Sequence, residues 1–345
     1  MRDRCQIIAE AGVNHNGSLD LAHRLIDAAH AAGADVVKFQ TFQTDQLVTA
    51  DAPKAKYQTA NMGTGGSQSA MLKALELPHE AFRELAGHCA ATGIEFLSTP
   101  FDIGSAHFLA GMGMRRFKVS SGDLTNKPFL RALARLGLPV ILSSGMATLG
   151  EIEAAVEVLE AENLDLSRIA LLHCTTEYPA PFAEVNLKAM QTIAAAFPAA
   201  EVGYSDHTEG IEVPVAAVAM GARIIEKHLT LDRTMPGPDH KASLEPAGMA
   251  AMVSAIRNVE LALGDGRKRP TASEMPNRSV ARKSIVAARA IRAGETLDEG
   301  NVAARRPGDG VSPMAWDEVL GTTAGRDYAA GELIAGAGLR RPAGK

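Results

Sequence analysis

Eight short apolar runs recur along the first two thirds of the chain, and most of them are separated by amphipathic stretches with helical periodicity. This alternation is typical of α/β proteins. Residues 19–33 and 149–163, for example, show the helical pattern. The runs that we expect to form strands cover residues 7–12, 35–42, 95–100, 116–121, 139–145, 169–175, 202–207 and 223–230.

Polar residues gather where these expected strands end. A purely structural strand has no reason to repeat this asymmetry, whereas a (β/α)8 barrel places its active site at the carboxyl ends of its strands. A doubly wound open sheet is the main alternative, but the segment GVNHNG after the first run is not the GxGxxG turn of such a sheet. We therefore predict a TIM barrel. The polar strand ends comprise Glu10, Asn14, His15, Asn16, Lys38, Gln40, Thr99, Lys118, Ser121, Ser143, His173, Ser205, His207, Glu226 and His228.

Two segments break the alternation of strand and helix. Residues 44–77 are too long and too rich in Gly and Ser for an ordinary loop, and we expect an excursion over the barrel mouth. Residues 266–280 are polar and punctuated by proline, which indicates a linker. We predict a catalytic barrel over residues 1–265, and over residues 281–345 a small domain of short strands and frequent glycine turns.

The composition favours a soluble globular protein without a polyanionic partner. Apolar residues make up 46% of the chain and charged residues 22%, a balance that permits a large core. The net charge of -5 supplies no basic field, so we expect neither nucleic acid nor an anionic membrane as a partner.

Cysteine usage and hydropathy point to the cytoplasm. Cys5, Cys89 and Cys174 are odd in number and include no CxxC pair, which fits reduced thiols. The N-terminus reaches Glu10 before any apolar segment of signal length, and no run approaches the roughly 20 apolar residues of a membrane span.

Two lysines interrupt otherwise apolar strands. Lys38 in VVKFQT and Lys118 in FKVSSGD would each be costly to bury without a partner. One interpretation is that both pair with carboxylates of the barrel. We favour an anionic ligand instead, because hydroxyl groups at other strand ends complete a phosphate-binding set: Thr99, Ser121, Ser143, Ser144 and Ser205.

Two histidines end the last two expected strands. His207 and His228 would face one lumen from neighbouring strands, where neutral imidazoles ligate a divalent cation and leave positions open for substrate oxygens. A hydrogen-bonded role in the core is the alternative for each. Glu226 lies on the same strand face as His228, where it would orient an imidazole, act as a base or pair with a lysine.

Two further residues have both a functional and an ordinary interpretation. Asp239 lies in a turn-rich segment beyond the last strand, where it either receives sugar hydroxyls or satisfies its own turn. Arg306 lies outside the barrel beside a Pro-Gly turn, which would present its guanidinium to a distant group. An exposed arginine in a loop is otherwise simply solvated.

Read together, the segments at the strand ends resemble the sialic acid synthase family, whose bacterial members make N-acetylneuraminate or N,N'-diacetyllegionaminate. The resemblance runs from about Ile7 through Leu339. It implies a barrel followed by an antifreeze-like (SAF) domain that docks onto the partner's active site in a domain-swapped homodimer. The segments are NHNGS, KFQTF, STPFD, KVSSGD, SSGMAT, HCTTEYPAP, GYSDHT, EKHLTLD, PGPDHKASLEP and RRPGDGVSP.

The resemblance also implies substrates and roles. The substrates would be phosphoenolpyruvate and an N-acylated hexosamine, either N-acetylmannosamine, our first expectation, or 2,4-diacetamido-2,4,6-trideoxymannose. His207 and His228 would bind manganese or magnesium beside Glu226. Phosphoenolpyruvate would be held by Lys38, Thr99, Lys118, Ser121, Ser143 and Ser205. The acceptor sugar would meet Asn16, Gln40, Thr176, Tyr178, Asp239 and, from the other subunit, Arg306.

The chain departs from the family pattern at a few positions. Asp123, which we expect to be catalytic, stands where the family usually has Glu, and Ser120 replaces a more common Pro or Gly. Asn16 and Thr176 stand where some neuraminate synthases have Glu and Asn. Two other functions remain open: a Schiff-base aldolase that uses Lys118 and pyruvate, and a sugar-binding protein whose terminal β domain performs the recognition.

Overall fold

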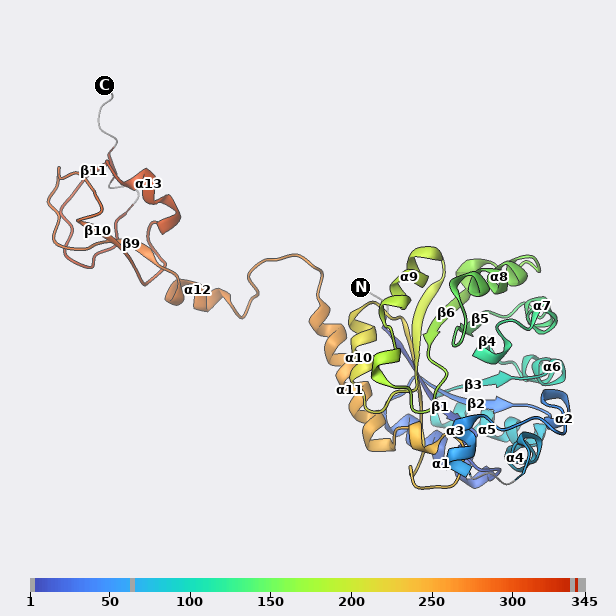
Figure 1. Ribbon diagram of the computed structural model, residues 1–345. Helices are drawn as coiled ribbons and strands as arrows, with labels where there is room; N and C mark the ends of the chain where they lie inside the picture. Colours follow the sequence, from blue (N-terminus) through green and yellow to red (C-terminus); the bar gives the residue numbers. More distant parts are fainter. Residues whose placement is uncertain (1–3, 63–65, 336–338, 341–345) are drawn as a thin grey trace. The chain divides into compact units, whose positions relative to one another are not determined.

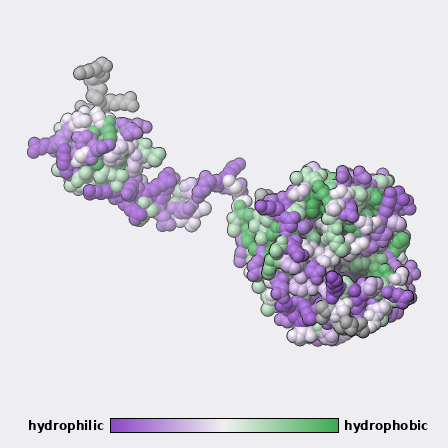
Figure 2. Space-filling model, viewed as in Figure 1, coloured by the Kyte–Doolittle hydropathy of each residue, from purple (hydrophilic) through white to green (hydrophobic). Residues whose placement is uncertain are grey.

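The computed structural model describes residues 4–62, 66–335 and 339–340. The chain divides into two compact units, Met1–Gly264 and Asp265–Lys345. Hydrophilic side chains cover much of the visible face of the first unit, with smaller hydrophobic patches between them (Figure 2). None of the described helices combines the length and the apolarity that a transmembrane segment needs.

The first unit is a TIM-like barrel of eight parallel strands (Figure 1). The strand order is β3-β2-β1-β8-β7-β6-β5-β4, and β3 and β4 lie side by side where the barrel closes. The predicted fold class is confirmed, and each of the eight expected runs overlaps one strand, with β1 and β7 beginning one residue earlier than expected. The strands are β1 (Gln6–Gly12), β2 (Val36–Thr41), β3 (Glu95–Pro100), β4 (Phe117–Val119), β5 (Val140–Ser143), β6 (Ile169–Cys174), β7 (Glu201–Asp206) and β8 (Ile224–His228).

Helices surround the barrel, and their apolar faces pack against the strands. Ser18 and Thr148 cap the first and fifth of these helices through their side-chain oxygens, and Thr148 forms a capping box with Glu151. Gly93, in the left-handed conformation, ends the second. The helices are α1 (Leu19–Ala31), α5 (His79–Thr92), α6 (Ile103–Gly111), α7 (Lys127–Arg135), α8 (Leu149–Glu160), α9 (Lys188–Ala196), α10 (Glu212–Ala219) and α11 (Pro246–Leu263).

Strands β7 and β8 approach each other closely at Gly203. A Cβ atom there would collide with the backbone carbonyl of Ile224 on the neighbouring strand. On the outer side of these strands Lys227 and Asp206, both fully buried, form an ion pair of 2.5 Å, and Tyr204 Oη donates to Asp206 Oδ1 at 3.0 Å. This packing fixes the spacing of the two strands that end in His207 and His228.

The described residues of the excursion, 44–62 and 66–77, contain three short helices: α2 (Thr44–Leu47), α3 (Lys56–Met62) and α4 (Gln68–Leu75). Glu76 ties both ends of the excursion together, since its Oε2 accepts from the backbone N–H and the hydroxyl of Thr44 at 2.9 and 2.6 Å. The described residues of the excursion therefore have a defined structure.

The second unit has its own small core. The expected linker is not wholly irregular, because α12 (Met275–Ala281) begins inside it. Beyond this helix lie two antiparallel pairs of strands and one short helix, around a core that includes Ile285, Leu297 and Tyr328. The elements are β9 (Ser284–Ala287), β10 (Val302–Arg305), α13 (Trp316–Val319), β11 (Thr323–Ala324) and β12 (Leu339–Arg340).

Candidate active site

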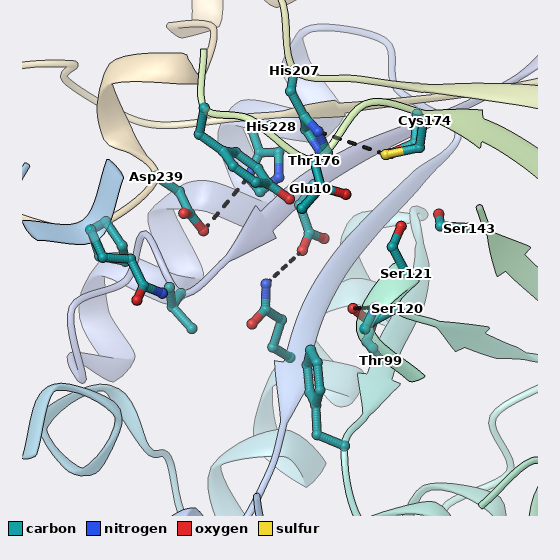
Figure 3. A pocket seen from close by; sticks show the side chains of 18 of the residues that line it. Glu10, Thr99, Ser120, Ser121, Ser143, Cys174, Thr176, His207, His228 and Asp239 are labelled. Carbon is teal, nitrogen blue, oxygen red and sulfur yellow. Dashed lines mark hydrogen bonds and ion pairs between the residues drawn. The ribbon is translucent and has the colours of Figure 1, made fainter. Parts of the chain in front are cut away.

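A cavity of ≈ 330 Å³ opens at the carboxyl ends of the barrel strands. Figure 3 shows hydroxyl side chains on one side of this cavity and the two histidines with Asp239 on the other. Most of the residues that the sequence predicted for the site line it together: Lys38, Gln40, Thr99, Lys118, Ser121, Ser143, Thr176, Tyr178, Ser205, His207, Glu226, His228 and Asp239.

Two lysines and two glutamates alternate in the cavity. Lys38 Nζ lies 2.7 Å from Glu10 Oε2 and 3.8 Å from Glu226 Oε2, and Lys118 Nζ lies 3.3 Å from Glu226 Oε1. All four side chains are at most 5% exposed. Each buried charge therefore has an opposite partner, which burial at this depth requires. The pairing with barrel carboxylates, which we weighed against an anionic ligand, does occur in the structure.

The surroundings of these lysines and glutamates shift their pKa values in different directions. Burial, with the charge of Glu226, raises the pKa of Glu10 to about 7 even though Lys38 opposes the shift. Burial would also raise the pKa of Glu226, but Lys118 and Lys38 outweigh it and hold the value below normal. Burial lowers the pKa of Lys118 despite Glu226. Groups with such divergent pKa values in one cleft are typical of an active site.

Hydroxyl and amide groups extend the charged set. Lys38 Nζ donates to Thr99 Oγ1 at 3.0 Å, Ser205 Oγ donates to Glu226 Oε1 at 3.1 Å, and Gln40 Nε2 donates to Glu10 Oε1 at 3.2 Å. These bonds orient the carboxylates against the ammonium groups.

At the hydroxyl side, Ser121 Oγ accepts from the backbone N–H of Gly145 at 2.9 Å. The hydroxyls of Ser143 and Thr176 are buried and make no hydrogen bond within the described structure. Buried hydroxyls are normally paired, so this side of the cavity has donors free for the oxygens of a ligand.

The two strand-ending histidines face each other across neighbouring strands. The ring centroids of His207 and His228 are 5.3 Å apart, and Tyr178 packs against both at 4.1 and 5.6 Å. His207 Nδ1 lies 2.7 Å from the Thr175 carbonyl oxygen, which leaves Nε2 to face the cavity. Burial, with the charge of His207, lowers the pKa of His228 well below normal, so this ring is neutral.

This pair fits a divalent cation. Metal–imidazole bonds are about 2.1 Å, so two rings that share one ion have centroids roughly 5 Å apart. His228 Nδ1 is buried without a hydrogen bond and lies 3.9 Å from Asp239 Oδ2, and burial raises the pKa of Asp239 to about 6. Among the described residues no group of three or more His, Cys, Asp or Glu side chains is arranged to hold an ion. Substrate oxygens and water would complete a two-histidine site.

Three expected residues of the barrel do not line this cavity: Asn16, Asp123 and Ser144, whose Oγ donates to the Leu172 carbonyl at 2.9 Å. Asn16 Nδ2 donates to the Pro236 carbonyl at 2.9 Å, and Asp123 accepts from Asn126 at 3.0 Å. Arg306 belongs to the second unit, where its Nε donates to the Ala281 carbonyl at 3.0 Å.

Sequence reasoning assigned no role to several lining residues. Glu10 was noted only as a strand end, although an acidic residue inside the run IIAEAG was a usable signal. Cys174 also lines the cavity, with its sulfur 3.7 Å from His207 Nδ1. Tyr57 and Gln58 come from α3, and nothing in the sequence of the excursion indicated that they face the cavity.

The fold and this cavity define a class: a TIM-barrel protein with an enzyme-like site at the carboxyl ends of its strands. Comparison with known proteins identifies its family. A model described as the NeuB family matches residues 25–268, and one described as the SAF domain matches residues 282–340. The chain belongs to the NeuB family, and the predicted resemblance to sialic acid synthases is confirmed.

Relatives with named activities span almost the whole chain. The chain is 50% identical to the N,N'-diacetyllegionaminic acid synthase of Campylobacter jejuni, over 95% of this chain and 98% of that protein. It is 46% identical to the enzyme of the same name from Legionella pneumophila, over 96% and 93%. A solved N-acetylneuraminic acid synthetase of Leptospira borgpetersenii superposes with a TM-score of 0.70 and 37% identity, over 80% of this chain and 90% of that one.

Proposed function

We propose that this protein condenses phosphoenolpyruvate with 2,4-diacetamido-2,4,6-trideoxymannose and water to give N,N'-diacetyllegionaminate and inorganic phosphate. The names of the two relatives at 50% and 46% identity support this acceptor. It was our second expectation from the sequence, after N-acetylmannosamine.

One juxtaposition carries the proposal. Glu226 lies 3.3 Å from Lys118, and two residues further along the same strand His228 faces His207. A binding place for a phosphorylated anion therefore adjoins a pair of imidazoles within one cavity. A condensation of two substrates needs their binding places to adjoin, so that the reacting atoms can meet.

The lysines and hydroxyls would hold phosphoenolpyruvate. Lys38 and Lys118 supply positive charge, and the free hydroxyls of Ser143 and Thr176 supply donors. An anion that enters competes with Glu10 for Lys38. Because the pKa of Glu10 is about 7, a proton on this carboxyl at neutral pH would accompany the exchange.

His207 and His228 would hold a manganese or magnesium ion. Such an ion, when bound, polarises the aldehyde of the open-chain sugar as a Lewis acid. Tyr178 packs on both rings and keeps them in place, and Asp239 lies beside His228 where it would meet the acceptor's hydroxyl or amide groups.

The reaction then forms one carbon–carbon bond. The enol carbon of phosphoenolpyruvate attacks the aldehyde, whose oxygen gains a proton. Water adds to the oxocarbenium carbon that remains and loses a proton, and the tetrahedral intermediate expels phosphate by C–O cleavage. Lys38 and Lys118 stabilise the charge on the departing phosphate.

The second unit would complete the site from a partner chain. We extend the proposal to a domain-swapped homodimer in which Arg306 of one subunit meets the acyl group of the sugar bound by the other. The presence of a SAF domain over residues 282–340 supports this arrangement.

A side-by-side assay of the two acceptors tests the proposed function. We expect release of phosphate from phosphoenolpyruvate with 2,4-diacetamido-2,4,6-trideoxymannose at a higher kcat/KM than with N-acetylmannosamine. A higher kcat/KM with N-acetylmannosamine would reverse the assignment of the acceptor. Release with neither sugar would reject the synthase, and trapping of pyruvate on Lys118 by borohydride would then indicate a Schiff-base aldolase.

A further inference from the structure

One side of the cavity is apolar. Seven apolar side chains, all from the segments that follow β1, β2 and β3, line it, and we call these seven the apolar wall. Four of the seven are half-buried, so part of each side chain remains available to a ligand. The apolar wall consists of Val13, Leu47, Val48, Met71, Leu72, Leu75 and Phe101.

Six of the seven wall residues, all except Val48, belong to a hydrophobic cluster separate from the barrel core. Val13, Met71 and Leu75 are buried in this cluster with Phe42, and Leu47, Leu72 and Phe101 pack against it. These residues come from the loops after β1, β2 and β3 and from helices α2 and α4.

Fixed contacts hold the wall against the barrel. Gly17, with φ of 75°, has no room for a Cβ because the carbonyl oxygen of Ala74 would lie 2.6 Å away. Asn61 Nδ2 on α3 donates to the Pro238 carbonyl at 2.6 Å. The wall is therefore a built part of the site, with a shape that a ligand must match.

The strand order decides which substrate meets the wall. The hydroxyls that would receive phosphate, those of Ser121, Ser143 and Thr176, follow β4, β5 and β6. The histidines end β7 and β8, and the next strands around the barrel are β1 and β2. A sugar whose aldehyde lies at the histidines therefore has the segments after β1 and β2, which carry most of the wall, on one side, and the hydroxyls of β5 and β6 on the other.

We propose that the apolar wall selects a 6-deoxy acceptor with an acylated amine at C4, by receiving the methyl groups at C6 and on that acyl group. This inference rests on the proposed function and adds the residues that set its specificity. A sugar with hydroxyls at C4 and C6 would bury them against methyl and aromatic groups without hydrogen-bond partners, which disfavours it.

The test compares the two sugars in variants of the wall. Val48→Thr keeps the shape of the side chain and adds a hydroxyl, and Leu72→Asn introduces an amide at a half-buried position. In each variant we expect the ratio of kcat/KM for 2,4-diacetamido-2,4,6-trideoxymannose to that for N-acetylmannosamine to fall by roughly 10-fold or more, the scale of one methyl or hydroxyl contact. The KM for phosphoenolpyruvate should stay within about 2-fold, because neither Val48 nor Leu72 is among the residues proposed to hold it.

A matched control separates an effect on acceptor selection from a general loss of stability or activity. Leu136→Asn makes the same change at a half-buried leucine outside the cavity and should leave the ratio unchanged. If Val48→Thr still condenses the trideoxy sugar and its ratio of kcat/KM values is unchanged, the proposed role of the apolar wall in acceptor selection is wrong. The proposed function would remain intact. A wild-type protein that uses neither sugar would instead overturn the proposed function.

Discussion

Replacement of His207 or His228 with Asn is expected to lower turnover by about 10³-fold or more, because each variant would remove one of the two proposed ligands for the ion that would polarise the aldehyde. The ring centroids are 5.3 Å apart and the rings do not hydrogen-bond to each other, so both rings are available to bind one ion placed between them. Chelation of the wild-type protein should abolish turnover, and added Mn²⁺ should restore it in the wild type alone.

Metal affinity provides a readout independent of activity. Titration of the metal-free protein with Mn²⁺, followed by electron paramagnetic resonance, should show one site in the wild type and greatly weakened binding in either variant. His173→Asn is the matched control, because His173 ends the neighbouring strand region but lies 2.7 Å from the Val185 carbonyl oxygen and does not line the cavity. Full turnover in metal-free protein would remove both histidines from the proposed role.

Replacement of Lys118 with Met should lower kcat/KM for phosphoenolpyruvate by about 10²–10³-fold, the usual effect of removing one group that stabilises developing charge. The change leaves Glu226 with Lys38 alone at 3.8 Å and makes the cavity more negative, which disfavours an anionic substrate. Lys73→Met is the control, because that lysine pairs with Glu76 at the surface and is 62% exposed.

Stability must be separated from catalysis in this variant. Loss of one partner from a buried ion pair costs about 3–5 kcal/mol in the free energy of unfolding. The double variant Lys118→Met with Glu226→Gln also removes the buried carboxylate charge that has lost its nearer cation, so its unfolding midpoint in urea should recover. Its activity should stay low. Recovery of both stability and activity would mean that Lys118 serves only the fold.

The barrel was predictable because its signal is periodic. Strand interiors must be apolar and strand ends need not be, so Lys38 and Lys118 stood out as charges that a buried strand tolerates only with a partner. The pairing of His207 with His228 followed from consecutive strands. These inferences depend on chain order alone.

Other features required coordinates. Lys227 lies between Glu226 and His228, and alternation along the strand only predicts that it faces away from them. Its ion pair with Asp206 depends on which residues the neighbouring strand brings opposite. Likewise Tyr57 reaches the cavity through the folding of α3, a segment whose sequence has no clear periodicity.

The fate of the bridging oxygen of phosphoenolpyruvate tests the central proposal most directly. With oxygen-18 in that position and 2,4-diacetamido-2,4,6-trideoxymannose as acceptor, mass spectrometry should find the label in the released phosphate and none in the nine-carbon ketoacid. Label retained in the ketoacid would contradict C–O cleavage in this cavity, and phosphate release without any nine-carbon product would contradict the condensation itself.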